Sequence, residues 1–141
     1  MATSTIPTAK ANLQTQLAAR AGLSGVQIAY GPPSVGMQKE YIWLGDADGR
    51  QVPAAMNLRN ESYDLQVIVD VIREGTDETS ADNRCFAIQA EIENQLRTDS
   101  TINGAVSYAE IDRFKLTENV TADGMTRTAR LVTLVHCTAY I

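Results

Sequence analysis

MTRTARLVTLVHCTAYI, residues 125–141, is the stretch that decides the fold of this chain. If it forms one strand, its middle is apolar on both faces: Ala129, Leu131, Val135, Cys137 and Ile141 occupy odd positions, and Val132, Leu134 and Tyr140 even ones. A strand at the rim of a small antiparallel sheet, with one face in water, would instead alternate apolar and polar residues. We therefore expect both faces to be covered, partly by other copies of the chain or by a partner.

The preceding strand is expected from about Ala105 to Val120, joined to the terminal strand around Ala122-Asp123-Gly124, a strong hairpin signal. A strand over residues 125–141 would extend roughly 55–60 Å, whereas a usual strand spans about 17–20 Å. Such a hairpin must either bend sharply or project its tip beyond the domain, where it would serve to grip a neighbour.

Two helices are predicted from apolar residues at helical spacing. Ala9, Leu13, Leu17 and Ala21 recur every fourth residue and predict a helix from about Pro7 to Ala21. The second helix follows the capping residues of segment 75–80 and runs to about Arg97. Its apolar stripe consists of Ala81, Cys85, Ile88, Ile92 and Leu96.

Three more strands are predicted by period-two alternation, over Val26–Tyr30, Glu40–Gly45 and Tyr63–Val71. We expect Asp46-Ala47-Asp48-Gly49 to close the second of them as a turn. Residues 46–61 then form a possible mobile loop or the arm of a hairpin. The order α-β-β-β-α-β-β predicts a single α+β domain over residues 1–141, with a mixed or antiparallel sheet, helices on one face and a long C-terminal hairpin.

The charge distribution of the chain restricts the classes of partner that it can bind. The net charge is −5, and residues 61–141 carry fourteen acidic and seven basic side chains, against three acidic and five basic in residues 1–60. An acidic half argues against a surface that grips nucleic-acid phosphates. Three interpretations of the acidic half stay open: it is a solvated face, it contacts the basic half of a neighbouring copy, or it faces a polyanion and repels it.

The sequence shows neither a targeting signal nor a pattern of cysteines that indicates disulfides or reactive thiols. No run of about 18 apolar residues predicts a membrane span, and the first residues do not resemble a secretory signal. Cys85 and Cys137 occupy apolar positions of a predicted helix and strand, and we expect buried thiols in a reducing compartment.

Motifs that carry chemistry are weak throughout. Segment 31–38 has the glycine spacing of a phosphate loop, but Met37 and Gln38 stand where lysine and serine or threonine are needed. His136 is the only histidine, and a structural histidine is the favoured interpretation over a catalytic base. Asp46 and Asp48 lack the further acids of a calcium loop. We therefore expect no enzyme activity, no cofactor and no metal site.

Subunit contacts are the more promising kind of site. Trp43 shares a strand face with Tyr41, which suits either core packing or an aromatic anchor between subunits. We take as subunit-interface candidates Trp43, Asp70, Arg73, Val132, Leu134 and His136.

Taken together, these blocks resemble the tail terminator (tail completion) proteins of long non-contractile-tailed bacteriophages. Five stretches carry the resemblance: residues 6–20, 26–33 and 40–45, the strand Tyr63–Val71 with Arg73, and residues 80–96. The likeness spans nearly the whole chain, although none of its motifs is chemically diagnostic.

The resemblance implies a virion protein that forms a homo-oligomeric ring, typically a hexamer, at the head-proximal end of the tail. Such a ring is assembled in the host cytoplasm, caps the tail tube protein, ends its polymerisation and meets head-completion or connector proteins, while DNA passes through without sequence recognition. Residues 46–61 would be an arm that orders on docking to the tube. Two alternatives stay open: another head–tail connector or a tail tube subunit, and, in a different class, a small ligand-binding or enzymatic α+β domain.

Overall fold

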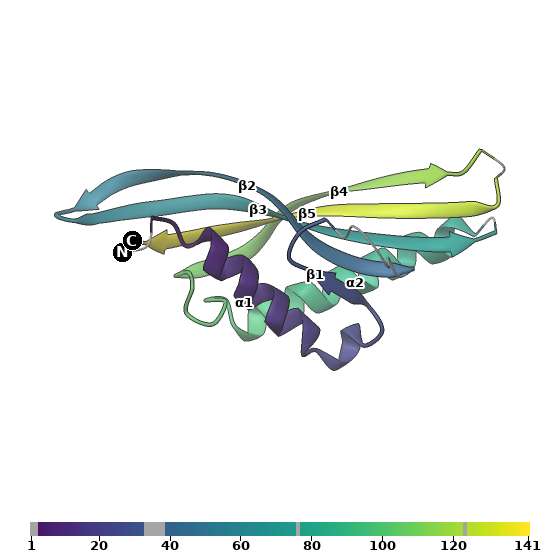
Figure 1. Cartoon of the computed structure of the whole chain (residues 1–141), viewed down its shortest axis with the longest axis horizontal. Helices are drawn as coiled ribbons and strands as arrows, with labels where there is room; N and C mark the ends of the chain where they lie inside the picture. Colours follow the sequence, from purple (N-terminus) through teal and green to yellow (C-terminus); the bar gives the residue numbers. More distant parts are fainter. Residues whose placement is uncertain (1–2, 33–38, 76, 123) are drawn as a thin grey trace.

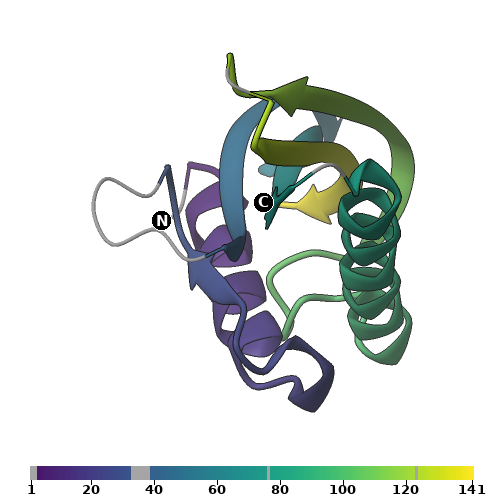
Figure 2. The ribbon, with the colours of Figure 1, turned by 90° about the vertical axis from the view of Figure 1, so that its right-hand side faces the viewer.

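The computed structural model describes residues 3–32, 39–75, 77–122 and 124–141. Both helices lie against one face of a curved five-stranded sheet (Figures 1 and 2). The elements are α1 (Ile6–Ala18), a 3₁₀ turn (Ala21–Leu23), β1 (Gln27–Ala29), β2 (Glu40–Ala55), β3 (Leu58–Glu74), α2 (Glu78–Thr98), β4 (Tyr108–Val120) and β5 (Thr126–Tyr140). The strand order is β1-β2-β3-β5-β4, with β1 parallel to β2 and the other pairs antiparallel. This arrangement confirms the predicted α+β fold with a mixed sheet and helices on one face.

The core lies between the helices and alternate residues of the central strands. Odd-numbered residues in the middle of β3 and β5 point towards the helices and are buried, among them Val67, Leu131 and Val135. Leu13 of α1 and Ile88 of α2 are equally buried in the same cluster. Burial of each such side chain contributes about 1.5–3 kcal/mol before entropy losses, so this layer holds the two helices to the sheet.

The helix termini follow from local chemistry. The Asp77 side chain accepts a hydrogen bond from the Ser80 backbone N–H over 3.0 Å, and this cap starts α2 at Glu78. In α1, proline in the first turn suits the start. The helix ends at Ala18 rather than at the predicted Ala21, because the chain there tightens into the 3₁₀ turn that buries Leu23.

β5 is not a rim strand: it lies between β3 and β4. It pairs with β3 along its whole length, from Tyr140 opposite Asn60 to Thr126 opposite Glu74. The unusual length of the C-terminal hairpin is thus matched by an equally long β3. Burial alternates along β5, so only its odd-numbered face is covered by this chain.

β2 contradicts the predicted turn at Asp46-Ala47-Asp48-Gly49. The strand continues to Ala55, with a bulge between Leu44 and Ala47, and pairs with β3 throughout. Turn-forming residues set only a local preference, and here the cross-strand pairing with β3 outweighs it. Residues 50–61 therefore belong to a hairpin, which was one of the two predicted possibilities for them.

Residues 48–60 are exposed throughout, and we call them the hairpin arm. Its turn is closed at Asn57, whose φ of 63° is a left-handed value that asparagine tolerates. The arm forms one end of the long axis of the molecule, and the β4–β5 turn lies at the other end (Figure 1).

Gly49 sits at the base of the arm, where β2 and β3 approach closely. A Cβ atom there would lie 2.4 Å from both the Ser62 carbonyl oxygen and the Tyr63 Cβ. Gly49→Ala should lower the free energy of unfolding by about 1–3 kcal/mol. The new methyl group would clash with the backbone of Ser62 and with the buried Tyr63, and neither has room to move away. Chemical denaturation measures this. Gly31→Ala is the control, since its Cβ meets nothing within 4 Å; equal effects in the two variants would contradict the crowding.

Both cysteines are fully buried and form no disulfide, as expected. Burial raises the pKa of the Cys85 and Cys137 thiols to about 12, which keeps them protonated and unreactive. Neither helix within the described residues is long and apolar enough to cross a membrane. Most of the rejected phosphate loop, residues 33–38, and the turn residue Asp123 lie outside the described residues.

Candidate functional site

One face of the sheet has no helix over it in the described part of the chain, and we call it the helix-free face (Figure 2). Alternation along β2, β3 and β5 places its side chains there, in cross-strand register. Its central members are Tyr41, Trp43, Ile68, Asp70, Arg130, Val132 and Leu134. A face this rich in aromatic and aliphatic side chains is the strongest candidate for an interface.

Asp70 organises one half of the helix-free face. Its carboxylate is completely buried and accepts hydrogen bonds from Trp43 Nε1 over 3.0 Å and from Arg130 Nε over 2.8 Å and Nη2 over 3.2 Å. The guanidinium carbon of Arg130 lies 5.8 Å from the centre of the Trp43 ring. The hydrogen bond that Arg130 donates to Asp70 raises the pKa of Arg130, and burial followed by the Asp70 charge raises the pKa of Tyr41.

An apolar hollow forms the other half. Val132 lies opposite Ile68 on β3 and opposite Lys115 on β4, and Leu134 lies opposite Gln66. Gln66, Val132, Leu134 and the segment 113–115 enclose about 330 Å³ of largely apolar character. Ile68 is almost fully buried, whereas Val132 and Leu134 are half-buried. The unusual apolar even-numbered side of β5 is therefore left open to a partner.

A row of polar residues borders this hollow. Asp48, Asp64, His136 and Glu110 follow one another across β2, β3, β5 and β4. The Nδ1 atom of His136 lies 2.9 Å from Asp64 Oδ1. A histidine held against a carboxylate at the margin of the face fits the structural interpretation that the sequence favours.

The structure brings five of the six candidate interface residues to the helix-free face: Trp43, Asp70, Val132, Leu134 and His136. Arg73 lies on the other side, where it donates to Glu40 over 2.6 Å, and Arg84 of α2 donates to the same carboxylate over 2.9 Å. These two arginines lower the pKa of Glu40 against the opposing effect of its burial. Arg73 therefore ties β3 to α2 and β2 within the chain.

Glu61 fastens the base of the hairpin arm to the N-terminal segment. Its buried carboxylate accepts hydrogen bonds from the Thr5 backbone N–H (2.8 Å), the Thr5 hydroxyl (2.6 Å) and the Gln51 amide (2.8 Å). Gln51 also donates to the Thr3 carbonyl oxygen over 2.7 Å. Burial alone would raise the pKa of Glu61, but the bonds from Thr5 and Gln51 outweigh it and hold that pKa below its usual value.

The lowered pKa of Glu61 predicts a pH-dependent contribution to stability. A carboxyl with a depressed folded-state pKa stabilises the fold fully above its unfolded pKa of about 4.3 and loses that contribution as the pH falls through the folded value. Glu61→Gln should therefore lower the free energy of unfolding most at neutral pH, with the difference from wild type shrinking below about pH 4. Denaturation from pH 7 to pH 3 measures it; a difference independent of pH would contradict the assignment.

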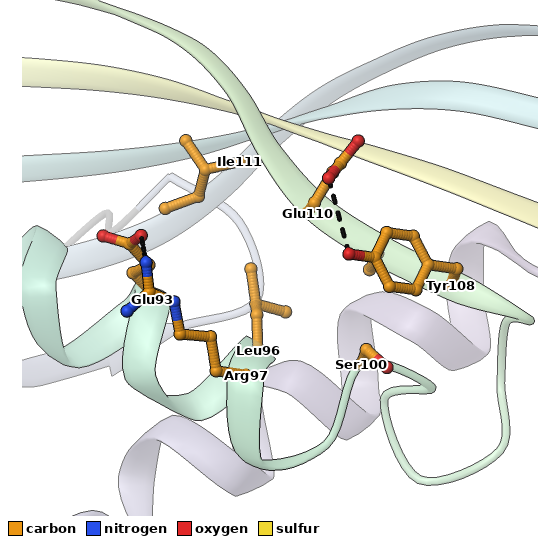
Figure 3. A pocket seen from close by; sticks show the side chains of 8 residues that line it. Glu93, Leu96, Arg97, Ser100, Tyr108, Glu110 and Ile111 are labelled. Carbon is orange, nitrogen blue, oxygen red and sulfur yellow. Dashed lines mark hydrogen bonds and ion pairs between the residues drawn. The ribbon is translucent and has the colours of Figure 1, made fainter.

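A second hollow, of about 430 Å³, lies between α2 and the start of β4 (Figure 3). Arg97 donates to Glu93 over 2.6 Å within the helix, and the Tyr108 hydroxyl lies 3.5 Å from Glu110 Oε2 within the strand. Neither histidine nor cysteine is among its eight lining residues. The charged groups pair along their own elements.

Two important residues of the site escape sequence reasoning: Arg130, which neutralises Asp70, and Glu61, which holds the arm. For Asp70 and Arg130, the sequence does contain a sign that a partner is needed. Asp70 interrupts the apolar run Val67–Val71, and a charged residue there needs a partner. Its partner lies 60 positions later in the chain and is identified only by the register of β3 with β5.

No protein-family model and no curated protein matches this chain. Among solved structures, the chain is similar to one in the virion of a native gene transfer agent (GTA) particle, with 15% sequence identity and a TM-score of 0.49. That alignment covers 92% of this chain and 94% of the other.

Proposed function

We propose that this chain is a structural protein of a phage-like virion, and more specifically a tail terminator. Its copies form a ring, typically of six, that caps the head-proximal end of the tail tube, ends tube polymerisation and presents a surface to head-completion proteins. DNA passes through the ring without sequence-specific binding. The protein works by assembly and carries out no catalytic step.

The observation that carries the proposal is the apolar half of the helix-free face. Val132, Leu134 and Trp43 are partly exposed on one face of the sheet, opposite the face that carries the helices and the core. Exposed apolar surface bordered by charged residues is typical of protein interfaces. A contact between this face and a different surface of the next copy is heterologous, and a heterologous contact closes into a ring when its rotation permits.

The resemblance to tail terminators supports the specific role. Its five stretches fall on α1, β1, β2, β3 and α2, which supply much of the core and part of the helix-free face. The acidic row of Asp48, Asp64 and Glu110 suits a surface near DNA that must slide, because like charges repel the phosphates.

Electron microscopy with purified tail tubes tests this role. A terminator should form closed rings alone or at one end of each tube and should stop tube growth when added during polymerisation. Open-ended polymers of this chain itself would identify a tube subunit instead. A protein that stays monomeric by sedimentation at every concentration, with tubes present or absent, would contradict assembly altogether.

A further inference from the structure

The hairpin arm carries the chemistry of a contact surface rather than of a solvated loop. It carries two arginines, Arg50 and Arg59, and its one acidic residue, Asp48, lies at its base. Val52, Met56 and Leu58 are 46%, 90% and 47% exposed. Pairing with β3 places the two arginines on opposite faces of the arm, so either face brings a guanidinium to a partner.

The far end of the sheet has the complementary character. Glu78 and Asp82 of α2 and Glu118 of β4 hold carboxylate oxygens within 4.8 Å of one another, and we call them the carboxylate triad. Within the described residues, both oxygens of Glu78 and Oδ1 of Asp82 are buried without a hydrogen-bond partner. Val120, nearby on β4, is 50% exposed.

Three carboxylates this close destabilise one another unless a proton or a cation is shared among them. The hydrogen bond with Asp82, followed by burial and the charges of Asp82 and Glu78, raises the pKa of Glu118 in agreement with that repulsion. A guanidinium offers five donors in a planar fork and suits such a group of acceptors.

The arm and the triad cannot meet within one chain. Strand β3 runs from Leu58 in the arm to Glu74 beside the triad, a distance of roughly 50 Å at about 3.3 Å per residue. Figure 1 shows the two regions at opposite ends of the molecule. Complementary surfaces at opposite ends of one rigid sheet join different copies head to tail.

We propose that the hairpin arm of one copy docks on the far end of the next, with Arg50 or Arg59 against the exposed carboxylate of Glu118, beside Asp82 and Glu78. This inference rests on the proposed ring and names a contact that joins its subunits. The exposed apolar residues of the arm pack beside Val120 of the neighbour. The occupant of the triad is thus a second copy of this chain.

Charge reversal with complementation tests the contact by sedimentation velocity in buffer containing a chelator. Arg50→Glu/Arg59→Glu places acid against acid, and Asp82→Lys/Glu118→Lys places base against base. Each variant alone should associate at least about tenfold more weakly than wild type. An equimolar mixture should assemble again as alternating copies, a rescue that misfolded protein does not show. Arg97→Glu, a single charge reversal elsewhere on α2, should assemble normally.

The outcomes separate this contact from the ring itself. Normal assembly of Arg50→Glu/Arg59→Glu, or a mixture that fails to recover although both variants fold by circular dichroism, overturns the arm contact and leaves the ring intact. A different result would assign the triad to a metal ion and overturn the contact: the wild type loses assembly in chelator and regains it with magnesium, and Arg50→Glu/Arg59→Glu does the same. A wild-type protein that never assembles overturns the ring, and the arm contact with it.

Discussion

Arg130→Ala is expected to lower the free energy of unfolding by about 2–4 kcal/mol, the largest loss from any single partly exposed side chain. The substitution removes the only cation paired with the buried Asp70 carboxylate within the described residues and leaves it with neutral donors, among them the Trp43 N–H. Breaking a buried ion pair on one side typically costs about 3–5 kcal/mol. Because the Arg130 side chain is itself 47% exposed, water partly replaces it and the expected loss is smaller.

Chemical denaturation followed by tryptophan fluorescence measures this loss directly, since Trp43 is the only tryptophan and lies in the network. Arg130→Lys keeps the charge but not the two-pronged contact, so it should recover part of the stability. Arg97→Ala is the matched control: its ion pair with Glu93 is exposed and four residues away on α2, and should matter by about 0.5 kcal/mol or less. A loss below about 1 kcal/mol for Arg130→Ala would show that Asp70 is hydrated.

The fold was largely predictable because its helices and central strands obey simple periodicities. Ala81, Cys85, Ile88, Ile92 and Leu96, all predicted as the apolar stripe of a helix, are the buried residues of α2. The prediction was wrong where local preference and tertiary pairing disagree. Asp46 and Gly49 favour a turn, but β3 supplies a partner along the whole segment and the strand continues with a bulge.

The candidate site was predictable only in part, for a physical reason. In a strand, successive side chains point to opposite faces, so Leu131 and Val132 can be assigned to different faces of β5 from the sequence alone. The apolar character of the second face is therefore visible without knowledge of the neighbouring strands. The contacts of Asp70 with Arg130 and of Glu61 with Thr5 join residues that are 60 and 56 positions apart in the sequence. Which residues meet depends on how the strands align and on how the chain folds back. Periodicity carries no information about such pairs.

Val132→Asp is expected to abolish assembly while the subunit stays folded. The new carboxylate would lie on the half-buried helix-free face, opposite Lys115 of β4, so the fold should change in stability by about 1 kcal/mol or less. In a subunit interface the same charge loses its water, which costs several kcal/mol at every contact. Association should therefore weaken by at least about a hundredfold.

Leu131→Asp is the matched contrast, one residue away on the opposite face. Leu131 is fully buried in the core, and a charge there should unfold the chain, because burying an unpaired charge costs as much as the roughly 5–15 kcal/mol by which domains are stable. Circular dichroism separates the two cases. If Val132→Asp unfolds as Leu131→Asp does, the even-numbered side of β5 is ordinary core.

Sedimentation velocity of wild type and Val132→Asp, side by side over a range of concentrations, tests most directly whether the helix-free face closes a ring. The account predicts a discrete oligomer for wild type and a folded monomer for the variant. A variant that assembles like wild type would contradict it, because the face would then be free of the subunit contact assigned to it.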